Sequence, residues 1–242
     1  MSDRYRFYCP NLAAGEVTLP DDQAHHAVNV LRLEVAAEVE VFDGAGGMAV
    51  AKVTAAGKRG VMVQLLGELT VSPPPMPDLT LATAAPKGDR LEWLVEQASQ
   101  LNVARIILLD CDRSVVKPKE SGGKIEKLRR LAIESAKQCG RNHVLKVEPM
   151  RTLKALLADT SLADTTVLAL DPRAAASASQ VVSPTGSFLA LIGPEGGWSD
   201  GELNLLATSP QIQRVRLTPT VLRIETACAA IAALCGCSSA VA

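Results

Sequence analysis

Three short segments combine turn residues with charged side chains, and each follows a predicted strand. Residues 192–198 read IGPEGGW, whose glycines let backbone approach a ligand closely. Ligands of open α/β sheets bind beyond the carboxyl ends of strands, so GPEGG at 193–197 is a candidate cofactor loop, with a simple tight turn as the alternative. The loop fits neither GxGxxG nor a phosphate loop, and the chain has no GK[ST], which argues against a nucleotide-dependent enzyme.

The second segment, residues 217–227, reads LTPTVLRIETA and sets Arg223 and Glu225 in the first turn of a predicted helix. Glutamate is favoured there by the helix dipole, whereas a cation is unfavourable unless it is paired. Arg223 is therefore expected to pair with Glu225, with Glu195 or with a ligand carboxylate or phosphate. In the third segment, PKGDR at 86–90, Lys87 and Arg90 could meet phosphates, and Asp89 could simply cap a helix.

A proline-rich stretch, VSPPPMPD at 71–78, divides the elements that must position these segments. Four prolines in five positions exclude helix and central strand and predict a stiff linker between domains 1–70 and 79–242. Short β-branched strands at 39–42 and 61–66, with a glycine-rich hairpin turn at 43–47, predict a compact barrel in the first domain. A short helix is expected before these strands, at 25–32.

Strands and helices alternate in the second domain, which predicts a parallel sheet covered on both faces. Helix 199–207 should begin with a capping box formed by Ser199 and Glu202. Helix 225–234 is too apolar all round to be exposed. The remaining strands are expected at 79–84, 105–109, 166–170, 188–192 and 215–217, and the remaining helices at 89–102 and 124–139.

The charges are unevenly distributed along a chain whose net charge is only −1. Residues 113–151 hold eleven Lys and Arg against four Glu, a net charge of +7. Such a segment could hold phosphates, because affinity for a polyanion depends on the local field; a solvated helix face explains it equally well.

The cysteines and the N-terminus bear on metals and compartment. Six cysteines show no CxxC pair and no nearby His, so reduced thiols are expected rather than a metal site or a disulfide framework. No apolar run approaches the roughly 20 residues of a membrane span, and the N-terminus has no apolar signal region. We therefore expect a cytoplasmic protein with no membrane partner.

The motifs occur in an order that resembles the RsmE family, the small-subunit (16S) ribosomal RNA uracil-N3 methyltransferases. PKGDRLEWLVEQASQLNV is followed by RSVV, AKQCGR, LIGPEGGWSDGE and VLRIETA, and RFY, HHAVNVLRL and FDGAGG fit the first domain. The resemblance implies an N-terminal PUA-like β-barrel and a SPOUT-type α/β domain with a C-terminal trefoil knot. It also implies a homodimer; the apolar helix after Glu225 could form part of the interface, or be buried within the monomer.

The same resemblance implies S-adenosylmethionine as cofactor, held by the knot loops. The matching residues here are Leu170, Asp171, Pro172, Ile192, Gly193, Pro194, Glu195, Gly196, Gly197, Leu217, Leu222 and Arg223. The chain departs from the family where Thr218, Pro219 and Thr220 replace a usual Gly and a usual Arg. Ile224 stands where Thr is usual, and QLN at 100–102 where ELG is usual.

For methylation of uracil N3, a proton must leave and the base must be unstacked, because N3 is paired inside a helix. Arg6 and Arg223 are candidates to contact RNA phosphate or the uracil, and Glu195 and Glu225 are possible bases, each with a structural alternative. The expected RNA-binding residues are Arg6, His25, Arg32, Lys87, Arg90, Arg113, Lys124, Lys127, Arg129, Arg130 and Arg141. The alternatives are methylation of a ribose or another base, and a non-catalytic RNA-binding or ribosome-assembly protein of the same fold.

Overall fold

The computed structural model describes residues 4–57, 59–116 and 123–237, which form two compact units. Unit 1 takes the chain up to Pro74 together with Ala136–Val144, and unit 2 takes Pro75–Ser135 and the chain from Leu145 onward. The division falls inside the proline-rich stretch. The sequence assigned 136–144 to the second domain, but this segment bonds to unit 1: Gly46 N donates to Asn142 O, and Val144 N donates to Gly44 O.

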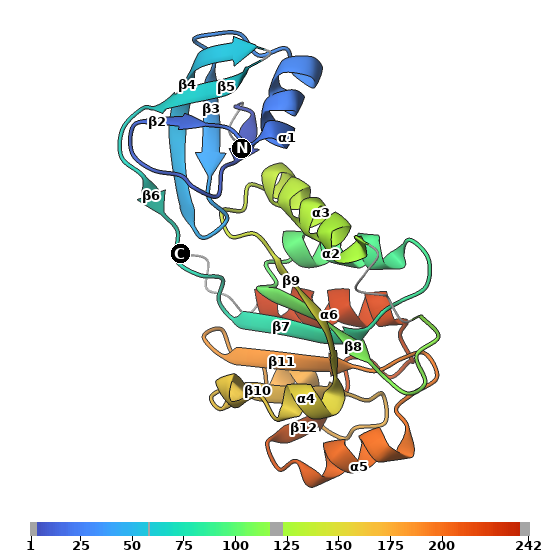
Figure 1. Ribbon diagram of the computed structural model, residues 1–242. Coiled ribbons are helices and arrows are strands. Elements are labelled where there is room, and N and C mark those ends of the chain that lie inside the picture. The colour runs from blue at the N-terminus through green and yellow to red at the C-terminus, as the bar shows by residue number, and fades with distance from the viewer. Residues whose placement is uncertain (1–3, 58, 117–122, 238–242) are drawn as a thin grey trace. The chain divides into compact units, whose positions relative to one another are not determined.

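Unit 1 is built on a mixed sheet of six strands (Figure 1). β3 (Glu38–Phe42), β4 (Gly47–Gly57) and β5 (Gly60–Leu65) are antiparallel neighbours, and the predicted turn at 43–47 joins the first two. β1 (Arg6–Tyr8) pairs parallel with β3, β2 (Glu16–Thr18) pairs with β5, and β6 (Thr70–Val71) pairs with β4. Inward residues such as Phe7, Val41 and Val63 form the core.

The predicted helix at 25–32 lies earlier in the chain than expected. α1 spans Asp21–His25, and a π-helical turn, η1, continues it over His26–Val30. Pro20 precedes the first turn, where its missing N–H costs nothing, and Asp21 and Asp22 favour the helix dipole. Pro20, Asp21 and Asp22 therefore mark the start of the helix better than His25 and His26 do.

Unit 2 contains the predicted parallel sheet, in the order β12-β10-β11-β7-β8-β9. Expected strands are present as β7 (Asp78–Ala84), β8 (Arg105–Asp110), β10 (Thr166–Leu170) and β11 (Ser187–Ile192). β9 (Lys146–Thr152) was not predicted. The strand expected at 215–217 begins earlier in the chain: β12 spans Ile212–Val215, and Arg216 adds only an isolated bridge to Ser177.

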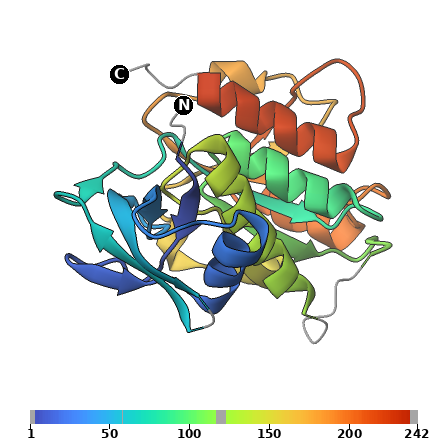
Figure 2. The same cartoon turned by 90° about the horizontal axis from the view of Figure 1, so that it is seen from above.

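The helices of unit 2 are α2 (Arg90–Gln100), α3 (Lys124–Cys139), α4 (Leu153–Leu157), α5 (Asp200–Thr208) and α6 (Ile224–Cys237), with 3-10 turns η3 (Thr160–Leu162) and η4 (Ala178–Gln180). The last turn of α3 belongs to unit 1. α6 packs against α2, β7 and β11, and Figure 2 shows the two helices side by side. Among the described residues, no helix has both the length and the apolarity of a membrane span.

α6 is buried on one face and partly covered on the other, in agreement with the expectation that so apolar a helix is not left exposed. Cys228, Ile231 and Ala232 lie in the core, whereas Ala229 and Ala230 are partly exposed. Alanine makes this face apolar while adding little exposed surface.

The capping box of α5 is confirmed. Ser199 Oγ accepts a hydrogen bond from Glu202 N, and Glu202 Oε2 accepts one from Ser199 N. Ser199 Oγ also donates to Asp112 Oδ2 at 2.6 Å.

Replacing Ser199 with alanine should remove this cap and lower the free energy of unfolding by about 1 kcal/mol. For a chain of this size the expected fall in Tm is roughly 2–4 °C per kcal/mol, measurable by calorimetry. Ser199→Asp keeps an N-cap acceptor and should recover the helix contribution, although it sets a second carboxylate beside Asp112. A Tm unchanged in Ser199→Ala would contradict the assigned role.

Candidate functional site

A cavity of about 970 Å³ lies in unit 2, lined by the loops that follow β10, β11 and β12. These loops leave the carboxyl ends of neighbouring parallel strands, the position at which ligands bind in open α/β sheets. All the residues expected to bind a cofactor line this pocket except Gly196. The loop segments that the sequence singled out separately are therefore brought together.

The loop after β11 is shaped by its glycines. A Cβ added to Gly193 would lie 2.7 Å from Cε2 of Trp198, so the indole ring packs directly on the glycine backbone. Gly197 has φ +73°, a left-handed conformation that glycine adopts without strain. Gly196 is covered by Arg113, which lines the pocket in its place: a Cβ at Gly196 would lie 3.3 Å from Arg113 Cβ.

The departures from the family pattern form an ordered part of the wall. Thr218 Oγ1 donates a hydrogen bond of 2.9 Å to Thr220 O, which closes a turn around Pro219. Residues 218–220 all line the pocket, and so does the buried Ile224. The substitutions thus give this loop its own internal hydrogen bond.

Two glutamates expected as bases occupy different environments. Glu195 is on the pocket wall, where its carboxylate lies 3.5 Å from Lys87 Nζ and 3.4 Å from Arg90 Nη1. Glu225 lies outside the lining with a side chain only 10% exposed, and its Oε1 is 3.7 Å from Arg90 Nε. Lys87 and Arg90, expected to meet phosphates, therefore hold these carboxylates.

Arg223 is exposed on the pocket wall. The sequence left three partners open, and the two glutamates pair with Lys87 and Arg90 instead. Within residues 4–57, 59–116 and 123–237, Arg223 has no ion pair, so a ligand anion is the remaining candidate.

Asp171 lines the pocket and is largely buried. Its Oδ2 accepts a hydrogen bond from Arg214 Nη2, and its Oδ1 accepts one of 2.8 Å from Arg173 N. Partial burial raises the pKa of Asp171, but the hydrogen bonds from Arg214 and Arg173 outweigh it, so the pKa is lowered overall.

Because this pKa is lower in the folded state, ionised Asp171 stabilises the fold above the unfolded pKa of about 3.9. That contribution is lost as pH falls from about 4 through the lower folded pKa. Asp171→Asn should therefore unfold at lower denaturant concentration at neutral pH, with the difference from wild type shrinking in acid. Urea titrations at several pH values check this; a difference independent of pH would contradict it.

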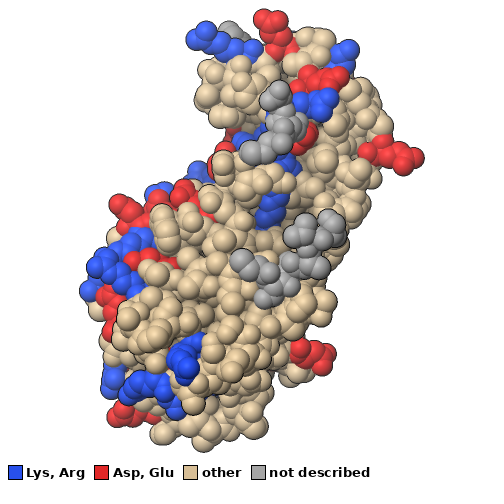
Figure 3. Space-filling model, turned by 180° about the vertical axis from the view of Figure 1, so that it is seen from behind, with Lys and Arg blue, Asp and Glu red and all other residues tan. Residues whose placement is uncertain are grey.

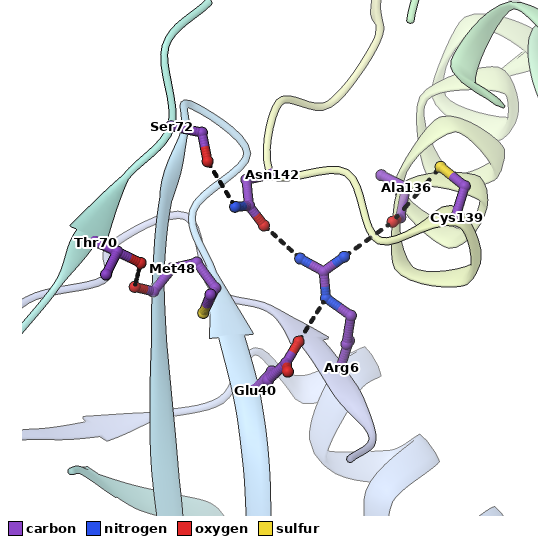
Figure 4. A network of polar contacts seen from close by, with 8 residues as sticks. All are labelled: Arg6, Glu40, Met48, Thr70, Ser72, Ala136, Cys139 and Asn142. Atoms are coloured by element: carbon purple, nitrogen blue, oxygen red, sulfur yellow. Dashed lines mark hydrogen bonds and ion pairs between the residues drawn. The ribbon is translucent and has the colours of Figure 1, made fainter. Parts of the chain in front are cut away.

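Arg6, expected at the RNA or the uracil, instead lies within a polar network of unit 1 (Figure 4). Its Nη2 donates to Asn142 Oδ1, its Nη1 donates to Ala136 O, and its Nε lies 3.2 Å from Glu40 Oε2. The guanidinium also stacks over the Phe42 ring, and the side chain is only 9% exposed. Burial lowers the pKa of Arg6, while Glu40 opposes that effect. These contacts give Arg6 a structural role.

Acidic neighbours accompany the basic segment expected to bind RNA. Lys127 Nζ donates to Glu92 at 2.6 Å, and Arg129 pairs with Glu126. On the face in Figure 3, Lys and Arg are interspersed with Asp and Glu. Lys124 is half-buried, and His25, Arg32, Arg113 and Arg130 are exposed.

Arg141, also expected to bind RNA, is largely buried. Its burial lowers its pKa to about 10, against an opposing contribution from Cys139. That position is better suited to packing within unit 1 than to phosphate contact.

Several pocket residues were missed by sequence reasoning. Among them, Trp198 and Leu203 follow the glycine loop at 193–197. Arg173 also lines the pocket, and its position directly after Asp171 and Pro172 was the available signal.

Comparisons with known proteins agree with this geometry. The sequence profile of an RNA methyltransferase domain matches residues 72–236, and that of an RNA methyltransferase PUA domain matches 19–66. The ribosomal RNA small subunit methyltransferase E of Bacillus subtilis is 30% identical over 220 residues, which cover 87% of this chain and 85% of the relative. The Rickettsia conorii protein of the same name is 31% identical, with coverages of 86% and 83%.

Comparison with solved structures also finds methyltransferases. A ribosomal RNA small subunit methyltransferase E from Neisseria gonorrhoeae, bound to S-adenosylmethionine, matches with a TM-score of 0.84 and 29% identity over 95% of both chains. A Legionella pneumophila protein in complex with the same cofactor matches with a TM-score of 0.85 and 27% identity, covering 98% of this chain and 99% of that one. The chain therefore belongs to the ribosomal RNA small subunit methyltransferase E family of RNA methyltransferases, with an N-terminal PUA domain.

Proposed function

We propose that this protein transfers the methyl group of S-adenosylmethionine to N3 of a uridine in small-subunit ribosomal RNA. The observation that carries the proposal is the pocket itself, where the loops after three parallel strands converge. Relatives with the same fold bind this cofactor in solved structures.

The lining fits such a cofactor. Ile192, Leu217 and Leu222 supply apolar wall, and Gly193 and Gly197 add backbone to the lining. At about 970 Å³ the cavity is at the upper end of the usual range for small-molecule sites, large enough for more than one ligand group. When bound, the cofactor supplies an activated methyl group, so the task of the protein is mainly alignment.

The side chains of this protein would then bind the uracil and accept the proton that leaves N3. Of the two carboxylates predicted as bases, Glu195 lines the pocket, and Lys87 and Arg90 hold its side chain in place. Glu225 lies outside the lining and is better suited to supporting Arg90.

The wider assignments follow the family. We propose a trefoil knot around the pocket loops; residues 176–178 bond to Arg216, which ties the loop after β10 to the segment after β12. We propose a homodimer that uses the exposed face of α6, where Figure 3 shows a wide surface without charged side chains. We also propose that the protein acts in the cytoplasm, where its ribosomal substrate is found. The proposed reaction requires no metal ion.

The direct test incubates the protein with tritiated S-adenosylmethionine and small ribosomal subunits from a strain lacking this activity. Digestion of the RNA should show the label in 3-methyluridine. Label in another nucleoside would overturn the N3 assignment, and label in a 2′-O-methyl ribose would identify a ribose methyltransferase. Cofactor binding measured separately provides the control: neither label nor binding would favour a non-catalytic protein.

A further inference from the structure

Asp171, which follows β10 and lines the pocket, pairs with Arg173 directly after it and with Arg214 on β12. Asp171 is held by Arg214 through one carboxylate oxygen and by Arg173 through the other. A single negative charge therefore faces two guanidinium groups. Arg223, which shares the pocket wall with Arg173, adds a third.

A hydrogen bond holds the backbone of Arg173, whereas most of its side chain is exposed to solvent. Its N–H donates to Asp171 Oδ1 at 2.8 Å, whereas its Nε lies 3.5 Å from the same oxygen. The side chain is 82% exposed, although it lines the pocket. The backbone bond thus sets the position of Arg173 at the mouth, and its guanidinium remains open to a ligand.

The other charges of the pocket are already matched. Glu195 is held by Lys87 and Arg90. Arg113 donates to Trp198 O at 3.0 Å and lies 3.7 Å from Asp200. The excess positive charge of the lining therefore resides on Arg173 and Arg223.

We propose that Arg173 and Arg223 bind phosphates of the RNA strand that carries the target nucleotide. A planar guanidinium matches the oxygens of a phosphate and remains charged at every working pH. This inference rests on the proposed function and refines it: the pocket mouth, in addition to the basic side chains of α3, anchors the RNA.

A second oxyanion, the carboxylate of the cofactor, has the same chemistry as a phosphate. The exposure of Arg173 favours RNA, because an RNA strand extends beyond the pocket and a guanidinium that is 82% exposed can reach its phosphates from the pocket mouth. The two sources make different predictions. Phosphate contacts release counterions and give a steep salt dependence, whereas a cofactor contact changes the affinity for S-adenosylmethionine.

The experiment compares Arg173→Ala and Arg223→Ala with Arg151→Ala, a control that removes a cation outside the pocket lining. Arg151 lies 2.7 Å from Asp159 and 3.6 Å from Glu148. The affinity of each protein for a small-subunit RNA fragment is measured over a range of salt concentrations, and the cofactor Kd by calorimetry. Each pocket variant should lower the salt slope by about one, Arg151→Ala should keep the slope of the wild type, and Arg173→Ala should keep the cofactor Kd of the wild type.

Arg173→Lys should keep the slope near that of wild type, because the charge remains. A wild-type slope in both alanine variants would overturn the proposal. A tenfold weaker cofactor Kd with an unchanged RNA slope would also overturn it and assign the arginines to the cofactor carboxylate. Failure of the proposed function would differ, because the wild type and Arg151→Ala would then also lack methyl transfer.

Discussion

Gly193→Ala is expected to weaken S-adenosylmethionine binding about tenfold or more and to reduce methyl transfer accordingly. The new Cβ would lie 2.7 Å from Trp198 Cε2, too close for either group to keep its place. Overpacking of this kind costs about 1–3 kcal/mol, and 1.4 kcal/mol corresponds to a factor of ten in affinity. Because the indole and the glycine loop both line the pocket, we expect the cost to appear in ligand binding.

Gly201→Ala is the matched control. A Cβ at Gly201 meets only Ser199 Oγ at 3.9 Å, an ordinary contact, and alanine favours the helix in which Gly201 lies. Calorimetry should give this variant the cofactor Kd of the wild type. Equal cofactor affinity in Gly193→Ala would show that Trp198 can move without disturbing the pocket.

Arg6→Met is expected to lower the free energy of unfolding by about 3 kcal/mol, because a buried ion pair loses one partner. The side chains of Arg6 and Glu40 are only 9% and 13% exposed, so Glu40 would keep a charge with little solvent to stabilise it. Asn142 Oδ1 and Ala136 O would lose a donor as well. Chemical denaturation followed by circular dichroism measures the loss.

The double variant Arg6→Met with Glu40→Gln should recover part of that loss, since it removes the stranded charge. Arg4→Met is the exposed control: its pair with Glu38 is 42% and 49% exposed and should contribute well under 1 kcal/mol. Equal losses in Arg4→Met and Arg6→Met would refute the burial argument. A double variant less stable than Arg6→Met would show that Glu40 is stabilised by other groups.

Local patterns were sufficient for the central strands and for the pocket loops of unit 2. Apolar runs such as 166–170 and 188–192 are too short for typical helices and so predict buried strands, and turn residues directly after them mark the edge of the sheet where ligands bind. The glycine loop and Arg223 were therefore found without tertiary information. Trp198 was not, because its contact with Gly193 depends on how the loop folds back.

β9 shows what a local pattern misses. Its sequence, KVEPMRT, contains Pro149 and carries charged residues at three of its seven positions. Proline is confined to edge strands and bulges, and β9 lies at the edge of its sheet, with a register shift opposite β8. Only pairing with β8 makes this segment a strand.

The environment of Arg6 was equally inaccessible, because its partners Ala136 and Asn142 lie more than a hundred residues further along the chain. An arginine near the N-terminus of an RNA-modifying protein suggests RNA contact. Burial and the choice of partner depend on contacts that no local periodicity encodes.

The segment Ala136–Val144 also determines when unit 1 can finish folding during synthesis. Its asparagine is the acceptor for Arg6, and its backbone bonds to residues 44 and 46. The ribosome must therefore translate more than half of the 242 residues before the N-terminal sheet acquires its last partners. A fragment that ends at Pro74 would lack these contacts from residues 136–144. Unit 1 therefore does not correspond to one continuous stretch of the chain that could be expressed alone or fused to another protein.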